Sequence, residues 1–221
     1  MLKMVVSDLD GTLIHGQNEL PPKVSRMLNS LNDKNILFAV ASGRKICELK
    51  KFFKNFQNDI IFIACDGAYV EYKGKVLLTE VISKQIIEKL TFKHDNLSDK
   101  DGNVVKIIVK NEFLSRRDEE YIKNNRLLSL VYDDFGIKEY VKYGINKGTA
   151  LHQVTEIFNI DKRDVIAFGD NSNDTQMLKF IPNSYAVKNA KDNIKRITRY
   201  QTEDVCNTVM KLIEETLEAG I

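Results

Sequence analysis

Four aspartates in two closely spaced pairs carry the strongest chemical signal in the sequence. Asp8 and Asp10 are separated by one residue, and Asp170 and Asp174 lie in the segment GDNSND at 169–174. Carboxylates packed together repel one another and stay ionised only when a cation neutralises them. Oxygen ligands select a hard divalent ion, and a few carboxylates suit Mg²⁺, which keeps water and phosphate as its other ligands. Such a cluster would therefore act on a phosphoryl group.

A hydroxyl and two basic side chains are candidates for the same site. Ser42, Gly43 and Arg44 follow an apolar run at 36–41, and Lys147 stands at the start of an expected helix. Ser42 is also a good N-cap for the helix expected after it. The helix dipole disfavours a cation at an N-terminus, so we expect an anion beside Lys147.

The elements that must position these residues are short apolar runs that alternate with amphipathic helices. Each run ends where candidate polar residues begin; the runs span residues 2–6, 36–41, 60–65 and 165–168. Strands that are apolar on both faces and separated by helices are typical of a buried parallel sheet. Ligands of such sheets bind beyond the carboxyl ends of the strands. We therefore predict an α/β fold with a Rossmann-like parallel sheet and one site at that edge.

The middle of the chain departs from this rhythm. A hairpin is predicted at 68–81 around Lys73-Gly74, followed by a more charged region with less continuous apolar runs. That region is predicted to form a small α+β insert with one sheet face open to water. The predicted division is 1–80 for the first half of the core, 81–143 for the insert and 144–221 for the second half.

Composition excludes several classes of protein. Among 221 residues, 33 basic and 31 acidic side chains give a net charge of +2, which offers no electrostatic case for nucleic acid or a membrane surface. The three cysteines form no C-x-x-C pair, which favours reduced thiols over a metal cluster. No apolar stretch approaches the roughly 20 residues of a membrane span. We expect a soluble, cytoplasmic protein.

Four motifs then give a family resemblance. DLDGT at 8–12, ASGR at 41–44, NKGTAL at 146–151 and GDNSND at 169–174 resemble, in order, the motifs of the haloacid dehalogenase-like (HAD) phosphohydrolases. The position of the insert, DGA at 66–68 and AVKNA at 186–190 resemble the Cof-type subgroup, in which an α/β cap is inserted after the third core strand. The resemblance implies a Mg²⁺-dependent phosphatase.

The resemblance also implies roles for individual residues. Asp8 would be the nucleophile that forms an aspartyl-phosphate, and Asp10 the general acid and then the general base. Ser42 would donate a hydrogen bond to the phosphoryl group, and Lys147 would offset the negative charge. The substrate-binding candidates are Ser42, Gly43, Arg44, Lys147 and Asn173.

The metal ligands implied by the resemblance come from both aspartate pairs. Asp8 and Asp170 would hold Mg²⁺ through their side chains, and Asp10 through its backbone carbonyl. Asp174 would ligate the ion or orient a water bound to it. The sequence departs from the family at Asn171, where Gly or Ser is common, and at Asp66, where the subgroup usually has Asn.

Three functions remain open from the sequence. The leading one is a phosphatase of small phosphorylated metabolites, such as sugar phosphates or phosphoglycolate-like acids. A phosphomutase acting on hexose phosphates and a non-catalytic phosphoacceptor module are the alternatives. The expected partner is a small phosphorylated metabolite, with no nucleic acid and no membrane, and the chain is expected to be a monomer or homodimer. Candidate readers of the leaving group in the cap are Lys106, Arg116, Arg117 and Lys142.

Overall fold

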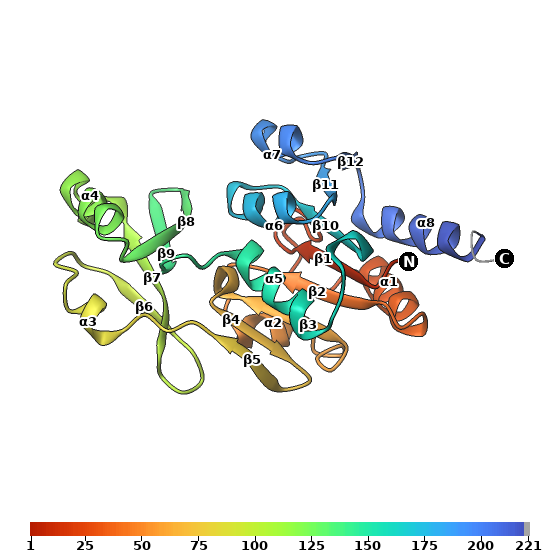
Figure 1. Cartoon of the computed structure of the whole chain (residues 1–221), viewed down its shortest axis with the longest axis horizontal. Helices are drawn as coiled ribbons and strands as arrows, with labels where there is room; N and C mark the ends of the chain where they lie inside the picture. The colour runs from red at the N-terminus through yellow and green to blue at the C-terminus, as the bar shows by residue number, and fades with distance from the viewer. Residues whose placement is uncertain (219–221) are drawn as a thin grey trace.

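The computed structural model describes residues 1–218, with side chains described as far as Glu215, and contains two β-sheets. The larger has the strand order β12-β11-β10-β1-β2-β3-β4-β5, and the smaller the order β6-β7-β9-β8. Figure 1 shows them as two lobes, with β6 to β9 in the lobe on the left. The strands of the larger sheet are β1 Met4–Asp8, β2 Leu37–Ala41, β3 Ile60–Ala64, β4 Tyr69–Tyr72, β5 Lys75–Thr79, β10 Val165–Gly169, β11 Asn183–Val187 and β12 Tyr200–Thr202.

The larger sheet is parallel from β12 to β3, and only the β4–β5 hairpin runs antiparallel at its edge. Every residue of β1, β3 and β10 is buried, so helices must cover both faces of this sheet. The helices of this lobe are α1 Pro22–Asp33, α2 Ile46–Phe52, α5 Lys147–Ile157, α6 Thr175–Phe180, α7 Asp192–Ile197 and α8 Val205–Glu218. The predicted α/β fold with a parallel core sheet is confirmed.

The strand registers explain why distant motifs meet. Asp8 pairs with Ala41 across β1 and β2, and Ser7 pairs with Phe168 across β1 and β10. The parallel strands β2, β1 and β10 therefore end together. Ser42, Asp8 and Asp170 consequently emerge at one edge of the sheet.

The smaller lobe, hereafter the cap, is an antiparallel sheet with two helices. Its elements are α3 Lys84–Ile87, β6 Asp95–Ser98, β7 Val104–Lys110, α4 Arg116–Asn124, β8 Leu128–Asp134 and β9 Ile137–Lys142. A separate apolar cluster, which includes Ile107, Val109 and Ile122, packs these elements together. The four strands and two helices fall within the segment 81–143.

Among the residues that the structure describes, no helix combines the length and the apolar character that a membrane span requires.

Candidate active site

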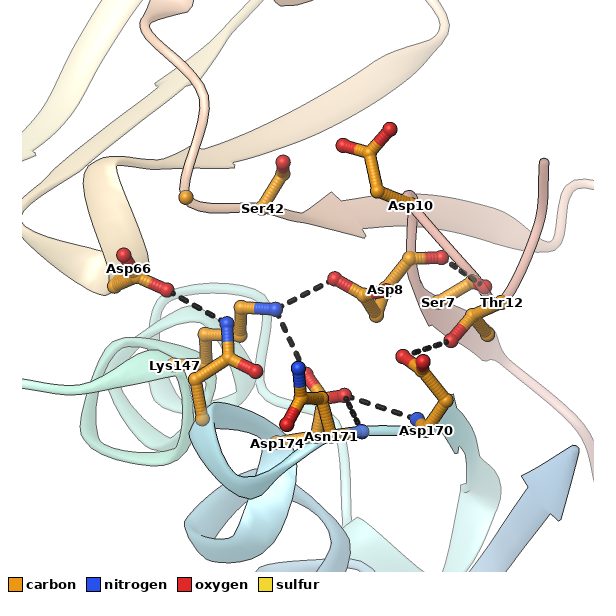
Figure 2. A network of polar contacts seen from close by, with 12 residues as sticks. Ser7, Asp8, Asp10, Thr12, Ser42, Asp66, Lys147, Asp170, Asn171 and Asp174 are labelled. Atoms are coloured by element: carbon orange, nitrogen blue, oxygen red, sulfur yellow. Dashed lines mark hydrogen bonds and ion pairs between the residues drawn. The ribbon is translucent and has the colours of Figure 1, made fainter. Parts of the chain in front are cut away.

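A buried lysine links two of the aspartates (Figure 2). Lys147 Nζ donates to Asp8 Oδ1 at 2.6 Å and to Asp174 Oδ1 at 2.7 Å, and the lysine side chain is fully buried. Burial alone would lower the pKa of Lys147, but Asp174 and Asp8 raise it above its usual value, so the ammonium stays charged. These carboxylates are the anions expected beside a lysine at the start of α5.

Asp174 organises the loop after β10. Its Oδ2 accepts hydrogen bonds from the backbone N–H groups of Asp170 at 3.0 Å and Asn171 at 3.1 Å. Its side chain is completely buried, and its other oxygen accepts from Lys147. Asp174 therefore fixes the position of Asp170 as well as adding charge to the site.

Asp8, Asp170 and Asp174 form a group that could hold a metal ion. One oxygen from each lies within 4.8 Å of the others. Asp8 Oδ2 is buried and has no hydrogen-bond partner among the described residues. Burial raises the pKa of Asp8 well above its usual value, although Lys147 partly opposes this. A buried, unpaired carboxylate oxygen facing further carboxylates fits a divalent cation held through oxygen ligands.

Asp170 approaches the DLDGT loop closely. Thr12 Oγ1 donates a hydrogen bond to Asp170 Oδ1 at 3.0 Å. Burial and the nearby Asp174 charge raise the pKa of Asp170, and this hydrogen bond partly opposes the rise. Gly11 has φ +86°, and a Cβ there would lie 2.5 Å from Asp170 Oδ2. Only glycine allows both the positive φ and this close approach.

Asp10 lies in a different position from Asp8. Its carboxylate accepts two hydrogen bonds from Arg44, from Nε at 2.8 Å and from Nη2 at 2.5 Å. Figure 2 shows the Asp10 side chain pointing away from the group formed by Asp8, Lys147 and Asp174. Asp10 and Asp8 nevertheless line the same cavity.

Ser42 is buried at the end of β2, and its hydroxyl accepts a hydrogen bond from the Arg44 backbone at 3.2 Å. The prediction that Ser42 caps the following helix is wrong, because α2 begins only at Ile46. The intervening residues form a turn that places Gly43 and Arg44 in the cavity wall.

The acidic residue at position 66 is neutralised by the cap. Lys106 Nζ, from β7, donates to Asp66 Oδ2 at 2.7 Å and to the Gly43 carbonyl at 3.1 Å, and pairs with Glu139. Asn173 donates to the other Asp66 oxygen at 3.0 Å. Burial opposes ionisation of Asp66, but Lys106 and the other donors hold its pKa below the usual value. Asp66 therefore adds no unpaired charge to the site.

Neither the Asp66–Lys106 pair nor Glu139 was predicted from the sequence. Lys106 is one of the four candidate cap cations, and the structure separates it from the others. Its side chain is only 1% exposed, whereas Lys142 is half exposed and pairs with Glu80 at 2.6 Å. The unusual acid at position 66 was the one sequence signal for a buried cation nearby.

We expect the Asp66–Lys106 pair to fasten the cap to the core. Asp66→Asn should lower the free energy of unfolding by about 1–3 kcal/mol, because Lys106 loses a buried partner. Since the folded-state pKa of Asp66 is depressed, this difference should be full above the usual aspartate pKa and disappear as pH falls through the folded value. Denaturant unfolding of Asp66→Asn, Lys106→Met and the double variant measures the coupling. If the losses of stability in the two single variants simply add up in the double variant, Asp66 and Lys106 do not stabilise each other.

A cavity of about 670 Å³ lies between the core and the cap. The core supplies Asp8, Asp10, the 42–44 turn, Asp66, Asp170 and Asn173. The cap supplies Leu97, Lys106, Ile108, Tyr132, Phe135 and Glu139. Arg116, Arg117 and Lys142 are not among the lining residues. A phosphate monoester in this cavity would meet carboxylates on the core side and mainly apolar side chains on the cap side.

Three features indicate a hydrolase that acts on phosphoryl groups: the α/β core with its cap, the acidic cluster at the carboxyl ends of the strands, and the buried lysine. Comparison with known proteins gives the family. The model of the haloacid dehalogenase-like hydrolases matches residues 5–97 and 91–213. The chain belongs to this family, and it is a phosphatase of the HAD type.

Individual relatives are similar along their whole length. The chain is 23% identical to the 5-amino-6-(5-phospho-D-ribitylamino)uracil phosphatase of Escherichia coli (strain K12), covering 96% of this chain and 97% of that protein. It is 25% identical to the phosphoglycolate phosphatase of Methanococcoides burtonii, covering 100% and 99%. A crystal structure from Streptococcus mutans UA159 superposes with a TM-score of 0.82 at 22% identity, covering 97% of this chain and 100% of that one. This last likeness concerns the fold.

Proposed function

We propose that this phosphatase hydrolyses small phosphate monoesters in a Mg²⁺-dependent reaction, with Asp8 as the nucleophile. The observation that carries the proposal is the buried Oδ2 of Asp8, which has no hydrogen-bond partner among the described residues. Asp8 lies beside the carboxylates of Asp170 and Asp174, and Asp8 and Asp170 line the cavity. The cavity is bounded on one side by the cap, which favours small substrates over a phosphorylated protein. Relatives named for a phosphorylated ribitylaminouracil and for phosphoglycolate support this class of substrate.

In the first step an oxygen of Asp8 attacks phosphorus, and the bond from phosphorus to the alcohol oxygen breaks. Asp10 donates its proton to that oxygen, so the leaving group departs as a neutral alcohol. Lys147 Nζ, 2.6 Å from Asp8, stabilises the charge of the nucleophile and the transferring group. Asp10 must leave Arg44 to reach the leaving oxygen, and a bound phosphate offers Arg44 another anion.

In the second step Asp10 takes a proton from water, and the resulting hydroxide attacks phosphorus of the aspartyl-phosphate. The bond from phosphorus to the Asp8 oxygen breaks, which releases phosphate and restores the Asp8 carboxylate. The Ser42 hydroxyl and the Gly43 backbone N–H are suited to hydrogen-bond the phosphoryl oxygens, because the backbone N–H groups of Ser42 and Arg44 already donate to the Ile63 carbonyl and to the Ser42 hydroxyl.

Asp8 and Asp170 are the side chains proposed to hold Mg²⁺, with the Asp10 backbone carbonyl as a third ligand. When bound, the ion neutralises the clustered carboxylates and the developing charge on the phosphoryl group. Asp174 supports Asp170 through the two backbone hydrogen bonds described above.

Magnesium-dependent phosphate release and thermal unfolding of Asp170→Asn test this proposal together. Without metal, the variant should be more stable than the wild type at neutral pH, because a buried like-charged carboxylate is removed. The raised pKa of Asp170 means that this advantage shrinks as pH falls through that pKa. With Mg²⁺ at 100 times its Kd, the wild type should gain about 2.7 kcal/mol, and the variant should gain little and lose activity.

Asp161→Asn is the matched control, since Asp161 is exposed and pairs with Arg163 away from the site. It should keep the full magnesium response and the wild-type rate. Equal stabilisation of Asp170→Asn and the wild type by Mg²⁺ would contradict the proposed metal site. Metal-independent phosphate release by the wild type would contradict the role of Mg²⁺.

A further inference from the structure

The tip of the β8–β9 hairpin carries an exposed aromatic residue in a conformation that aromatic residues rarely adopt. Phe135 has φ 51° and Gly136 has φ 76°, and Asp134 pairs directly with Ile137. Two positive φ values in a two-residue loop are typical of a type I′ turn, which favours Asn-Gly. A bulky side chain with positive φ is a genuine outlier among proteins.

Phe135 gains no packing that would offset this strain. Its side chain is 88% exposed, and it belongs to neither apolar cluster of the described residues. The β4–β5 hairpin provides an internal comparison, because Lys73 and Gly74 form a two-residue loop with φ values of 50° and 72°. The same turn is therefore built elsewhere in the chain with a polar residue in the first position. Strain without compensating contacts points to function.

The position of Phe135 indicates what that function is. Phe135 lines the same cavity as Asp8 and Asp10. Figure 1 places β8 and β9 on the side of the cap that faces the core, and Lys191 Nζ of the core lies 3.5 Å from Asp134 Oδ2 next to the tip. The tip of the hairpin therefore lies beside the core, with its aromatic residue in the wall of the candidate active site.

The chemistry of the surrounding wall selects among leaving groups. On the cap side, Leu97, Ile108 and Tyr132 line the cavity together with Phe135. Lys106, the one cap cation among the described lining residues, already contacts two carboxylates and a carbonyl. The cap therefore offers a leaving group an aromatic and apolar surface, with its cation already neutralised.

We propose that Phe135 is a specificity-determining residue that stacks on a planar ring in the leaving alcohol of the substrate. The preferred substrates are then phosphate monoesters whose alcohol carries an aromatic or heteroaromatic ring. This inference rests on the proposed phosphatase function. Offset stacking and edge-to-face contacts both favour a ring over a saturated group of similar size.

The test compares phenylalkyl phosphates of increasing chain length with their cyclohexylalkyl counterparts. At the best length, the wild type should show kcat/KM about 10-fold higher for the phenyl compound. Phe135→Asn and Phe135→Leu should each bring this ratio of kcat/KM values close to one, because neither side chain has an aromatic ring. Leucine keeps an apolar side chain, so this variant separates ring stacking from general apolar contact. Phe135→Asn should also raise Tm by about 2–4 °C, since asparagine suits the turn.

Phe113→Asn is the control, because Phe113 is an exposed aromatic residue of the cap that does not line the cavity. It should keep the phenyl preference of the wild type. The proposal is overturned if the wild type shows no preference for the ring, or if the preference survives in Phe135→Asn. Asp8-dependent hydrolysis of p-nitrophenyl phosphate is measured in parallel, so that a failure of the phosphatase function itself is recognised separately.

Discussion

Asp8→Asn should lower kcat for p-nitrophenyl phosphate by at least about 10³-fold, with saturating Mg²⁺ present. An amide oxygen is a poor nucleophile and cannot form a stable acyl phosphate with release of the leaving group. The remaining activity would come from positioning and electrostatic stabilisation alone, which act without a covalent step. Steady-state phosphate release measures the effect.

The same substitution should leave the fold intact. Burial raises the pKa of Asp8, which means that its charge is unfavourable in the folded protein above that pKa. Loss of the unfavourable charge offsets the weaker hydrogen bond that the neutral amide oxygen accepts from Lys147, so Tm should change little. Asp164→Asn serves as the control, because Asp164 contacts Lys3 and the N-terminus far from the site. Robust turnover by a folded Asp8→Asn protein would exclude Asp8 as the nucleophile.

Lys147→Met should produce the largest loss of stability of any substitution at the site. The lysine side chain is fully buried, and its ammonium lies 2.6 Å from Asp8 and 2.7 Å from Asp174. Removing the cation leaves two buried carboxylates uncompensated, which costs about 3–5 kcal/mol. Denaturant unfolding of the metal-free protein at neutral pH measures this difference.

The pH dependence of Lys147→Met distinguishes this electrostatic cause from lost packing. Lys147 lowers the pKa of Asp8, so without it the folded-state pKa of Asp8 should rise further. The variant should then recover stability as pH falls through that raised value, because a protonated Asp8 needs no cation. Lys188→Met is a matched control: its partner Glu203 is exposed, and the loss should stay below about 1 kcal/mol. A penalty for Lys147→Met that does not vary with pH would contradict the account.

Much of the core and of the candidate site follows from the sequence for a local reason. The apolar runs before Asp8, Ser42 and Asp170 are parallel strands whose carboxyl ends lie at the same level of the sheet. Once the sheet is parallel, its topology brings these residues to one edge without further information. Lys147 joins them because α5 begins there, and the structure brings Lys147, Asp8 and Asp174 into contact.

The cap is less predictable because its contacts are set by how it sits on the core. Lys106 and Asp66 lie 40 residues apart on different lobes, and no sequence pattern specifies that they meet. The strand β6 has no apolar pattern that would predict it, because Leu97 is its single buried residue. The φ of Phe135 is likewise a property of the folded hairpin, in which the strand register closes the loop with two residues.

Trapping the aspartyl-phosphate intermediate tests most directly whether the phosphoryl group passes through Asp8. The wild-type enzyme is mixed with p-nitrophenyl phosphate and Mg²⁺, quenched in acid within milliseconds, digested and analysed by tandem mass spectrometry. We predict phosphate on the peptide that contains Asp8, located on that side chain and absent from the Asp8→Asn protein treated in the same way. Phosphate on another residue, or a wild-type burst of p-nitrophenol with Asp8 unmodified at every quench time, would contradict the account.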